Sequence, residues 1–470
     1  MSDAQLDARF ARACELAEHG HDLEARQAFL DLLAIAPNHA GALNNFGTLL
    51  FRTGYVTAAR TAYREAVAQH PADPVGRVNL GNLLLETHEP GEARLQFEAA
   101  LNADPDLAEA HRGLAYCLDE AGDDAGARRH RDSAFIGRAI TQLPWRGQGR
   151  PIRLLMLVAA RGGNVPTRQL IDDRVFATTV AVADYCDPGQ PLPPHDLLFN
   201  AVGDADLAGD AVAAARLVAA RSAAPVINPP ERVGATGRVE VARRLGDIQG
   251  VRTPSIVVLP RIVLQGSGGA VALTGRGMAF PLLVRALGFH TGRHFLRVEK
   301  PSDLAGAVAA LPGELLAAIE YLEACGPDGR WRKYRAMMID GQLYPLHLAV
   351  SDSWKVHYFT AGMADHPEHR AEEARFLANM TEVLGPNATM ALEGICARLD
   401  LDYGGIDFGI GPGGEILVFE ANATMVVNPP EPDVIWDYRR EPVRRVLDAV
   451  RQMLLRRAGV TSISPIANLT

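Results

Sequence analysis

Residues 406–430 read IDFGIGPGGEILVFEANATMVVNPP, and this pattern predicts a β-hairpin. Apolar and polar residues first alternate, as on a half-buried strand, and an apolar run resumes at Ile416. Between the two runs, residues 411–414 have the sequence Gly-Pro-Gly-Gly, which is typical of a turn. If the chain folds back about the midpoint between the last two of these glycines, Asp407 lies opposite Glu420.

The expected pairing of Asp407 with Glu420 needs an explanation, because two carboxylates directly opposite each other repel. A hard divalent cation supplies one, since Mg²⁺ takes oxygen ligands, commonly one or two carboxylates together with phosphate oxygens. Asn422 lies on the same strand face as Glu420, because side chains two residues apart in a strand point the same way. The alternative is a surface hairpin whose acidic pair faces water, and the hairpin alone leaves both interpretations open.

The whole sequence is that of an ordinary multidomain globular protein. Its 470 residues predict two to four domains, and 48% apolar and 22% charged residues are normal proportions. A net charge of −9, without a dense lysine or arginine run, argues against a general nucleic-acid binder. The five cysteines are scattered and form no CxxC, which favours buried thiols in a reducing compartment over a disulfide framework or a zinc site. The N-terminus lacks the apolar segment of a signal peptide and no apolar run approaches membrane-spanning length, so we expect a soluble, cytoplasmic protein.

The first third of the chain repeats with a period of 34 residues. A small residue, an aromatic residue and a closing proline recur in the same order, as in Gly47, Tyr63 and Pro71 and again in Gly81, Phe97 and Pro105. This order and period resemble the tetratricopeptide repeat, in which each helix pair must stack on its neighbours to bury its apolar side. About four copies fit, so we expect an all-α repeat solenoid over residues 1–140.

Several asparagines fall on the first helices of these repeats, on the expected concave face. Asn45 and Asn79 occupy the same repeat position, and Asn44 and Asn82 lie close by. They resemble the asparagine ladder with which the repeats of O-linked N-acetylglucosamine transferase grip a peptide backbone, a task for which an amide offers both a donor and an acceptor. The resemblance implies a peptide or protein partner; the alternative is that these amides satisfy neighbouring helix ends.

Residues 141–150 form a predicted linker, because the segment from Leu143 to Pro151 carries two prolines and two glycines. Beyond it, short apolar runs that indicate strands alternate with helical patterns. Strands at residues 152–160, 196–200 and 224–230, with a helix at residues 211–222, predict a small α/β domain over residues 151–235.

Residues 236–470 are expected to form a further domain. Strands are predicted at residues 255–259, 281–285 and 316–322. Residues 332–339 and 342–350 predict a hairpin across Asp340-Gly341, a strong turn signal, and we expect residues 354–357 to continue its second strand.

The order of these segments resembles the ATP-grasp superfamily, which includes D-alanine–D-alanine ligase, glutathione synthetase and the ribosomal-protein glutamate ligases. The resemblance covers residues 151 to 470 and implies an α/β domain followed by an α+β fold in which two lobes clamp ATP. In that family a strand aspartate and a Glu-x-Asn motif about 13 residues later hold Mg²⁺ on the nucleotide phosphates. Asp407, Glu420 and Asn422 have this spacing, so the resemblance implies that they bind Mg²⁺, or Mn²⁺ in its place.

The resemblance also implies which cations contact phosphate. Arg285 stands where the family usually has a lysine on the α- and β-phosphates, and arginine binds phosphate with a planar fork instead of a point charge. Lys355 resembles the lysine that reaches the γ-phosphate, with Arg335 as a second candidate. His347 and His357 could touch phosphate or substrate, or be ordinary structural histidines.

Two further regions would contact ATP if the resemblance holds. A flexible cover over the phosphates, whose backbone N–H groups face anions, would comprise Gly288, His290, Thr291 and Gly292. The hinge that hydrogen-bonds adenine would comprise Glu320, Tyr321 and Leu322. One position departs from the family: related ligases often carry an arginine two residues before the metal-binding aspartate, and here that residue is Gly405.

A second group of metal-ligand side chains occurs at residues 365–369, which read Asp-His-Pro-Glu-His. Because the proline interrupts a helical face, the segment is interpreted as a solvated loop. Residues 266–269 lack the lysine of a P-loop and are interpreted as a turn.

Taken together, the resemblances imply a tetratricopeptide-repeat module fused to an ATP-dependent carboxylate–amine ligase. In such a ligase a carboxylate attacks ATP to give an acyl phosphate, and an amine then displaces phosphate to form an amide. Two alternatives stay open: an ATP-binding adaptor that has lost catalysis, and a phosphotransferase of the same fold.

Overall fold

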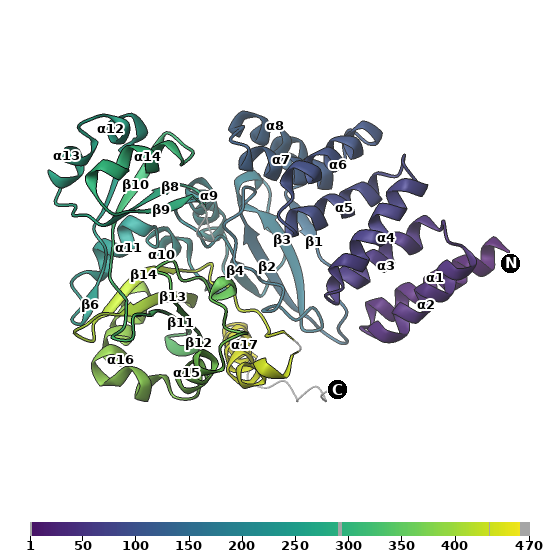
Figure 1. Ribbon diagram of the computed structural model, residues 1–470. Coiled ribbons are helices and arrows are strands. Elements are labelled where there is room, and N and C mark those ends of the chain that lie inside the picture. Colours follow the sequence, from purple (N-terminus) through teal and green to yellow (C-terminus); the bar gives the residue numbers. More distant parts are fainter. Residues whose placement is uncertain (1, 290–293, 432, 461–470) are drawn as a thin grey trace. The chain divides into compact units, whose positions relative to one another are not determined.

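The computed structural model describes residues 2–289, 294–431 and 433–460 and divides the protein into two compact units, Met1–Arg138 and Ala139–Thr470 (Figure 1). The first unit is built from helices only over its described residues, whereas the second contains three β-sheets with helices around them. Within the described residues, no helix combines the length and apolar character that a membrane span requires.

The first unit consists of helices that pack in consecutive pairs, α1 with α2, α3 with α4, α5 with α6 and α7 with α8. Their bounds are α1 Asp3–Glu18, α2 Asp22–Ile35, α3 Ala40–Arg52, α4 Val56–Gln69, α5 Pro74–Glu86, α6 Pro90–Ala103, α7 Ala108–Glu120 and α8 Asp124–Phe135. The repeat glycines allow close helix crossings, because a Cβ on Gly47 would lie 2.6 Å from the Tyr63 ring and one on Gly81 2.7 Å from the Phe97 ring. The predicted helical repeats are therefore confirmed.

The second unit begins with a five-stranded sheet in the order β1-β3-β2-β4-β5. Its strands are β1 Ile140–Gln142, β2 Ile152–Val158, β3 Phe176–Val182, β4 Leu197–Asn200 and β5 Val226–Ile227, and helix α9 Gly209–Ala219 connects the last two. All neighbouring strands are parallel except β1, which runs antiparallel to β3. The start of the expected linker is therefore a strand, since pairing with β3 satisfies backbone groups at that sheet edge.

A smaller lobe follows the short helices α10 Pro230–Gly234 and α11 Arg238–Leu245. It contains an antiparallel sheet in the order β7-β10-β8-β9, with helices α12 Arg261–Gln265, α13 Gly269–Thr274 and α14 Leu304–Ala309 packed on it (Figure 1). The strands are β7 Ile256–Pro260, β8 Leu282–Ala286, β9 Phe295–Val298 and β10 Leu315–Glu320. This lobe has its own apolar core, centred on Leu282, Val284 and Leu316.

The third sheet has the order β12-β11-β13-β14-β6. Its strands are β6 Val251–Arg252, β11 Trp331–Ile339, β12 Gln342–Ser351, β13 Tyr403–Ile410 and β14 Ile416–Asn422. Helices α15 Pro367–Ala378, α16 Met380–Leu399 and α17 Asp437–Arg457 pack against it. Residues 354–357 do not continue β12 as expected, because the chain bends at Ser351-Asp352-Ser353, where Ser353 N donates to Ser351 Oγ (3.1 Å).

Alternation along the strands divides the third sheet into an apolar face and a polar face. Tyr334 stacks on Phe408 and contacts the edge of Phe376 from α15, so these side chains face the helices. The neighbouring Arg335 and Asp407 therefore point to the opposite face. The polar face of this sheet is where the candidate site lies.

Candidate functional site

Four ionisable residues lie side by side across the third sheet, one from each of four neighbouring strands. Arg335 on β11 pairs in register with His347 on β12 and with Asp407 on β13, and Asp407 pairs with Glu420 on β14. We call these four residues the charged row. The expected pairing of Asp407 with Glu420 is confirmed.

The hairpin reaches this pairing by a different route from the one expected. Its strands pair symmetrically about Gly413, since Ile410 lies opposite Ile416, and that symmetry alone would place Asp407 opposite Phe419. A β-bulge between Asp407 and Phe408 shifts the register by one residue and brings Glu420 opposite Asp407 instead.

Asp407 is buried and held by two cations. Arg335 forms a fork on it, with Nε 2.5 Å from Oδ1 and Nη2 2.8 Å from Oδ2, and Lys333 Nζ lies 3.1 Å from Oδ2. Burial acts to raise the pKa of Asp407, but the charges of Arg335 and Lys333 outweigh it and hold the pKa well below its usual range. The carboxylate is therefore ionised although only 3% of the residue is exposed.

Glu420 and Asn422 form a second polar group on β14. Glu420 Oε1 accepts hydrogen bonds from Arg238 Nη2 and from Asn422 Nδ2, both at 3.1 Å. Asn422 Oδ1 accepts from Thr424 N and Oγ1, both at 2.9 Å. The amide of Asn422 thus presents its nitrogen, not its oxygen, to Glu420.

The donor set suits a hard divalent cation. Two ionisable carboxylates, Asp407 and Glu420, project from directly paired positions on one face, and oxygen is the ligand that Mg²⁺ prefers. Three cationic side chains, Arg335, Lys333 and Arg238, offset their charge. A metal ion here would compete with these cations for carboxylate oxygens.

A cavity of about 200 Å³ opens between the polar face of the third sheet and the smaller lobe. It brings together most of the residues singled out from the sequence: Arg285, Glu320, Tyr321, Leu322, Lys355, His357, Asp407 and Glu420. Its walls carry five cationic side chains (Arg238, Arg285, Arg332, Lys333 and Lys355) against three carboxylates (Glu320, Asp407 and Glu420). Asn422 lines a smaller cavity that shares Arg238 and Glu420 with this one.

The smaller lobe contributes Arg285, which lies on β8. Its guanidinium donates to the carbonyl oxygen of Phe289 and lies 5.8 Å from the centre of the Phe295 ring. Burial, together with the charge of Arg238, lowers the pKa of Arg285 to about 10. Gly288, in the expected cover, has a positive φ of 79°; His290, Thr291 and Gly292 lie outside the described residues.

The expected hinge begins at Glu320, the last residue of strand β10, and its side chains have partners of their own. Glu320 accepts from Ser255 N (3.0 Å) and Arg252 Nη2 (2.8 Å); burial acts to raise its pKa, but these contacts lower it. The Tyr321 ring has the guanidinium of Arg297 4.1 Å from its centre. Glu320 is therefore directed at the segment between β6 and β7, and the aromatic ring of Tyr321 lies at the cavity wall.

Lys355 and His357 reach the cavity from the bend after β12, not from a strand. Lys355 is exposed, whereas burial, with the charges of Lys333 and Arg335, lowers the pKa of His357. His347, in the charged row, is more deeply buried, and its pKa is lowered by burial and by Arg335.

Gly405 has no space for the arginine that the sequence resemblance leads us to expect at this position. A Cβ there would lie 2.8 Å from Met425 Cγ, 3.0 Å from Met337 Sδ and 3.1 Å from the carbonyl oxygen of Ala336. Glycine is thus required by close packing, and Arg335 on the neighbouring strand is a cation on the same sheet face.

In the first unit, some of the asparagines are exposed, as peptide-binding amides would be, and others make structural contacts within the repeats. Asn44 is buried and hydrogen-bonds Asp73 and Asn79, both at 3.4 Å, as a structural amide would. Asn45 donates to Cys14 Sγ (3.1 Å) but is exposed, and Asn82 is exposed.

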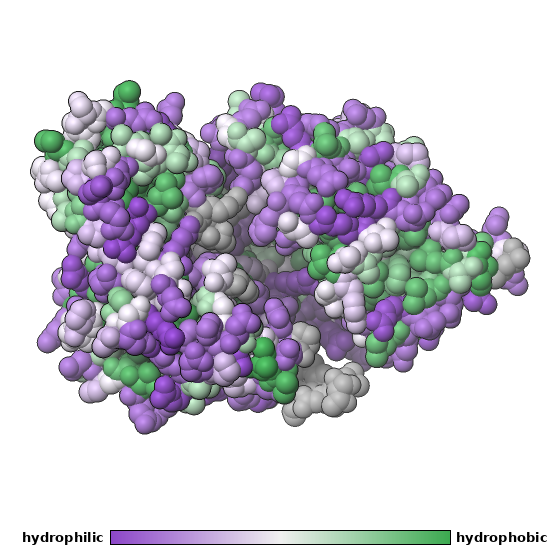
Figure 2. All heavy atoms as spheres, in the orientation of Figure 1, coloured by the Kyte–Doolittle hydropathy of each residue, from purple (hydrophilic) through white to green (hydrophobic). Residues whose placement is uncertain are grey.

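In Figure 2, hydrophobic residues gather over the N-terminal helices; the exposed large apolar side chains of α2 are Leu23, Leu30 and Ile35.

The sequence interpretation missed Lys333, Arg238 and the aromatic residues of the cavity wall. The sequence could have indicated Lys333, because this residue precedes Arg335 by two positions and therefore lies on the same face of the strand. No local pattern in the sequence indicates Arg238, since this residue at the start of helix α11 contacts Glu420 only through the tertiary fold. Trp331, Trp354 and Phe295 line the same cavity.

No protein-family model matches the sequence. Similar solved structures include MamA 41-end from Desulfovibrio magneticus RS-1, with 22% identity over 27% of this chain and 73% of that chain, and a TM-score of 0.26. A tetratricopeptide repeat protein from Parabacteroides merdae ATCC 43184 shows 18% identity over 27% of this chain and 51% of that chain, also with a TM-score of 0.26. TM-scores this low do not support any inference about function. The assignment of the helical repeats rests on the 34-residue period and on the pairing of the helices.

Proposed function

We propose that the second unit is an ATP-dependent carboxylate–amine ligase of the ATP-grasp type. The observation that carries this proposal is the cavity in which an excess of cationic side chains meets the paired carboxylates Asp407 and Glu420.

The charge of the cavity indicates an anionic ligand. A chain with a net charge of −9 places five cations against three carboxylates on one cavity wall. Arg285, Lys333 and Lys355 come from three separate segments, which suits a ligand with several anionic groups in a row, as in a triphosphate.

One part of the cavity wall suits a planar ring. Tyr321, Leu322, Phe295, Trp331 and Trp354 supply apolar and aromatic surface at the end of β10 and around it. Aromatic faces stack on purine bases, and the chain following β10 would supply backbone groups for hydrogen bonds to adenine.

The residues of the sheet would act by position and charge. Asp407 and Glu420 would hold Mg²⁺, which when bound neutralises phosphate charge and orients the phosphoryl group. Lys333, Arg335 and Lys355 would stabilise the charge that develops when a substrate carboxylate attacks the γ-phosphate. The acyl phosphate so formed would react with an amine, releasing phosphate and leaving an amide.

The repeats of the first unit would recruit a peptide or protein that supplies the carboxylate or the amine. Stacked helix pairs create an extended concave surface, and Asn45 and Asn82 expose amides there.

The test is Mg·ATP binding by calorimetry, followed by ADP release with pools of acids and amines. We expect Lys333→Met to weaken Mg·ATP binding about tenfold or more, while Arg243→Met on helix α11, whose side chain is 72% exposed, has no effect. Absence of Mg·ATP binding by the unaltered protein would refute the proposal.

A second candidate, an ATP-binding adaptor without catalysis, is favoured by the packing around Gly405, which excludes an arginine. Mg·ATP binding without ADP release from any substrate pool would identify the adaptor, and a stable phosphorylated product would identify a phosphotransferase.

A further inference from the structure

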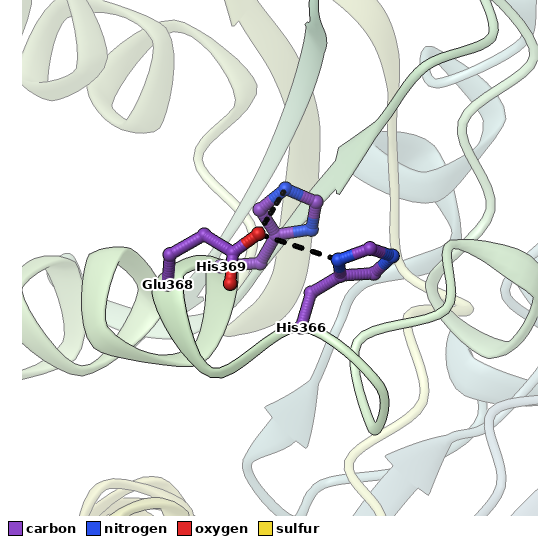
Figure 3. A group of neighbouring side chains, drawn as sticks. All are labelled: His366, Glu368 and His369. Atoms are coloured by element: carbon purple, nitrogen blue, oxygen red, sulfur yellow. Dashed lines mark hydrogen bonds and ion pairs between the residues drawn. The ribbon is translucent and has the colours of Figure 1, made fainter.

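We propose that the protein has a separate transition-metal site formed by His366, Glu368 and His369 at the start of helix α15 (Figure 3). Pro367 is the first residue of this helix, a position where proline is favoured, so the segment is not the solvated loop expected from the sequence. His366 occupies the N-cap position without a side-chain capping hydrogen bond, and the other two residues lie in the first turn.

The three side chains converge in the way that a metal site requires. Glu368 Oε1 lies 3.3 Å from His366 Nδ1 and 3.9 Å from His369 Nε2, and all three ligand atoms lie within 4.8 Å of one another. The two imidazole rings also contact each other, with their centres 4.6 Å apart. With metal–ligand bonds of about 2.0–2.2 Å, tetrahedral ligand atoms are about 3.4 Å apart. Small rotations of the side chains would therefore place all three on one ion.

His369 supplies an independent indication of a ligand. Its side chain is only 3% exposed, yet neither ring nitrogen has a hydrogen-bond partner among the residues that the structure describes, and Nε2 faces Glu368. A buried polar atom without a partner is costly, because it has lost its contact with water. An ion bound to Nε2 would give one of these two buried nitrogen atoms a partner.

The donor set selects the class of metal. Two imidazoles and one carboxylate suit Zn²⁺, Co²⁺ or Ni²⁺, whereas Mg²⁺ prefers oxygen ligands only. His366 and Glu368 are 42% and 55% exposed, so a fourth position remains open to water. The proposed site is thus chemically distinct from the pair Asp407 and Glu420.

A bound ion would fix the first turn of α15, whose second turn reaches the cavity wall. Glu372, one turn after Glu368, binds Arg332 Nε (2.6 Å), and Glu373, one turn after His369, accepts from Tyr438 Oη (2.5 Å). The role that follows from this placement is structural.

The test is Zn²⁺ binding by the metal-stripped full-length protein, without ATP, measured by competition with a chelating dye. We expect one equivalent to bind tightly, and His366→Ala and Glu368→Gln each to weaken that binding at least about tenfold. Both residues are partly exposed, so circular dichroism should show that these variants keep the fold. Co²⁺ in place of Zn²⁺ should give visible absorption bands that both variants lose.

The matched control is His21→Ala, which removes an exposed histidine–glutamate pair, His21 with Glu24 (3.1 Å), that belongs to no three-ligand group among the described residues. Its Zn²⁺ affinity should equal that of the unaltered protein. The proposal is overturned if the unaltered protein does not compete with the dye, or if His366→Ala and Glu368→Gln bind Zn²⁺ as tightly as His21→Ala does.

Discussion

At the scale of single residues, Asp407 combines a proposed role in binding with a role in stability. Its carboxylate is the counter-charge of both Arg335 and Lys333, whose side chains are 18% and 16% exposed. Glu420, by contrast, is 31% exposed and pairs with Arg238. The two carboxylates should therefore respond differently to neutralisation.

We expect Asp407→Asn to lower the free energy of unfolding by about 3 kcal/mol, because it leaves two largely buried cations without their counter-charge. Glu420→Gln should cost less than about 1 kcal/mol, since a more exposed pair is screened by water. Urea denaturation measures both values. Combining Asp407→Asn with Arg335→Met should cost less than the sum of the single changes, and equal losses for Asp407→Asn and Glu420→Gln would contradict this assignment.

A second prediction at this scale concerns His347 and pH. Burial and Arg335 lower its pKa in the folded protein, whereas in the unfolded chain the pKa is about 6.5. Below that pH the unfolded state takes up a proton that the folded state does not, so the free energy of unfolding falls as the pH falls. The contribution of one such histidine approaches about 1.4 kcal/mol per pH unit.

We expect His347→Gln to reduce the slope of stability against pH between pH 6.5 and 5, measured by urea denaturation at a series of pH values. His357 and His369, whose pKa values are also lowered by burial, should keep part of the slope. An unchanged slope in His347→Gln would show that His347 is protonated equally in both states.

The pairing of Asp407 with Glu420 shows what a sequence can and cannot reveal about a residue. The turn and the alternation were sufficient to predict the hairpin. The bulge beside Phe408 was not predictable, because it depends on packing against neighbouring strands and not on a local motif. The facing carboxylates were predicted because the expected fold-back point, between Gly413 and Gly414, lies half a residue beyond the observed one at Gly413, and this difference offsets the bulge.

At the scale of secondary-structure elements, helix α17 is tied to two turns of the third sheet. Arg457 Nη2 lies 2.7 Å from Asp402 Oδ1 and 2.9 Å from Asp340 Oδ1, while Arg456 Nη2 lies 2.8 Å from Asp340 Oδ2. Asp402 is buried and also accepts from Asn228 N (2.8 Å). The end of α17 therefore fixes the entries to β12 and β13.

We expect Arg457→Ala to lower the free energy of unfolding by about 1–2 kcal/mol, because it leaves the buried carboxylate of Asp402 with one partner fewer. Arg456→Ala is the matched control and should cost about 0.5 kcal/mol or less, since Arg456 is 57% exposed and contacts only Asp340 in this group. Thermal unfolding of the two variants side by side measures the difference. Equal shifts would argue against a role for Asp402.

Element by element, the sequence predicted strands best where an apolar run or a turn signal was strong, as in the apolar run of β2 and the hairpin of β11 and β12 across Asp340-Gly341. It failed at residues 354–357, which alternate like a strand but follow a bend of serine and aspartate side chains. It also missed the start of α15, where Pro367 opens a helix that the proline had seemed to exclude. In both cases the local residues fit two conformations, and tertiary packing decides between them.

At the scale of the whole molecule, the chain divides in sequence after Arg138 into a unit whose described residues form helices only and a unit with three sheets. Each has separate apolar cores: residues such as Phe97 and Leu84 in the first, and Phe199 and Phe408 in the second. Units with their own cores are expected to fold alone.

We expect residues 1–138 and residues 139–470 to fold as separate fragments. The first should show a helical circular-dichroism spectrum with cooperative thermal unfolding, and the second should bind Mg·ATP with the affinity of the full chain. Aggregation of the second fragment, or its loss of Mg·ATP binding measured by calorimetry, would show that it depends on the repeats.

The two cations on Asp407 have a consequence for the order of events at the proposed site. While Arg335 and Lys333 hold this carboxylate, neither guanidinium nor ammonium is fully available to a phosphate. A divalent ion that takes over Asp407 would release both of them toward the nucleotide. The ion would in this way raise the affinity of the protein for the nucleotide. Linkage then requires the nucleotide to raise the affinity for the ion by the same factor. Measured separately, each ligand alone would therefore bind weakly, and the pair would bind cooperatively.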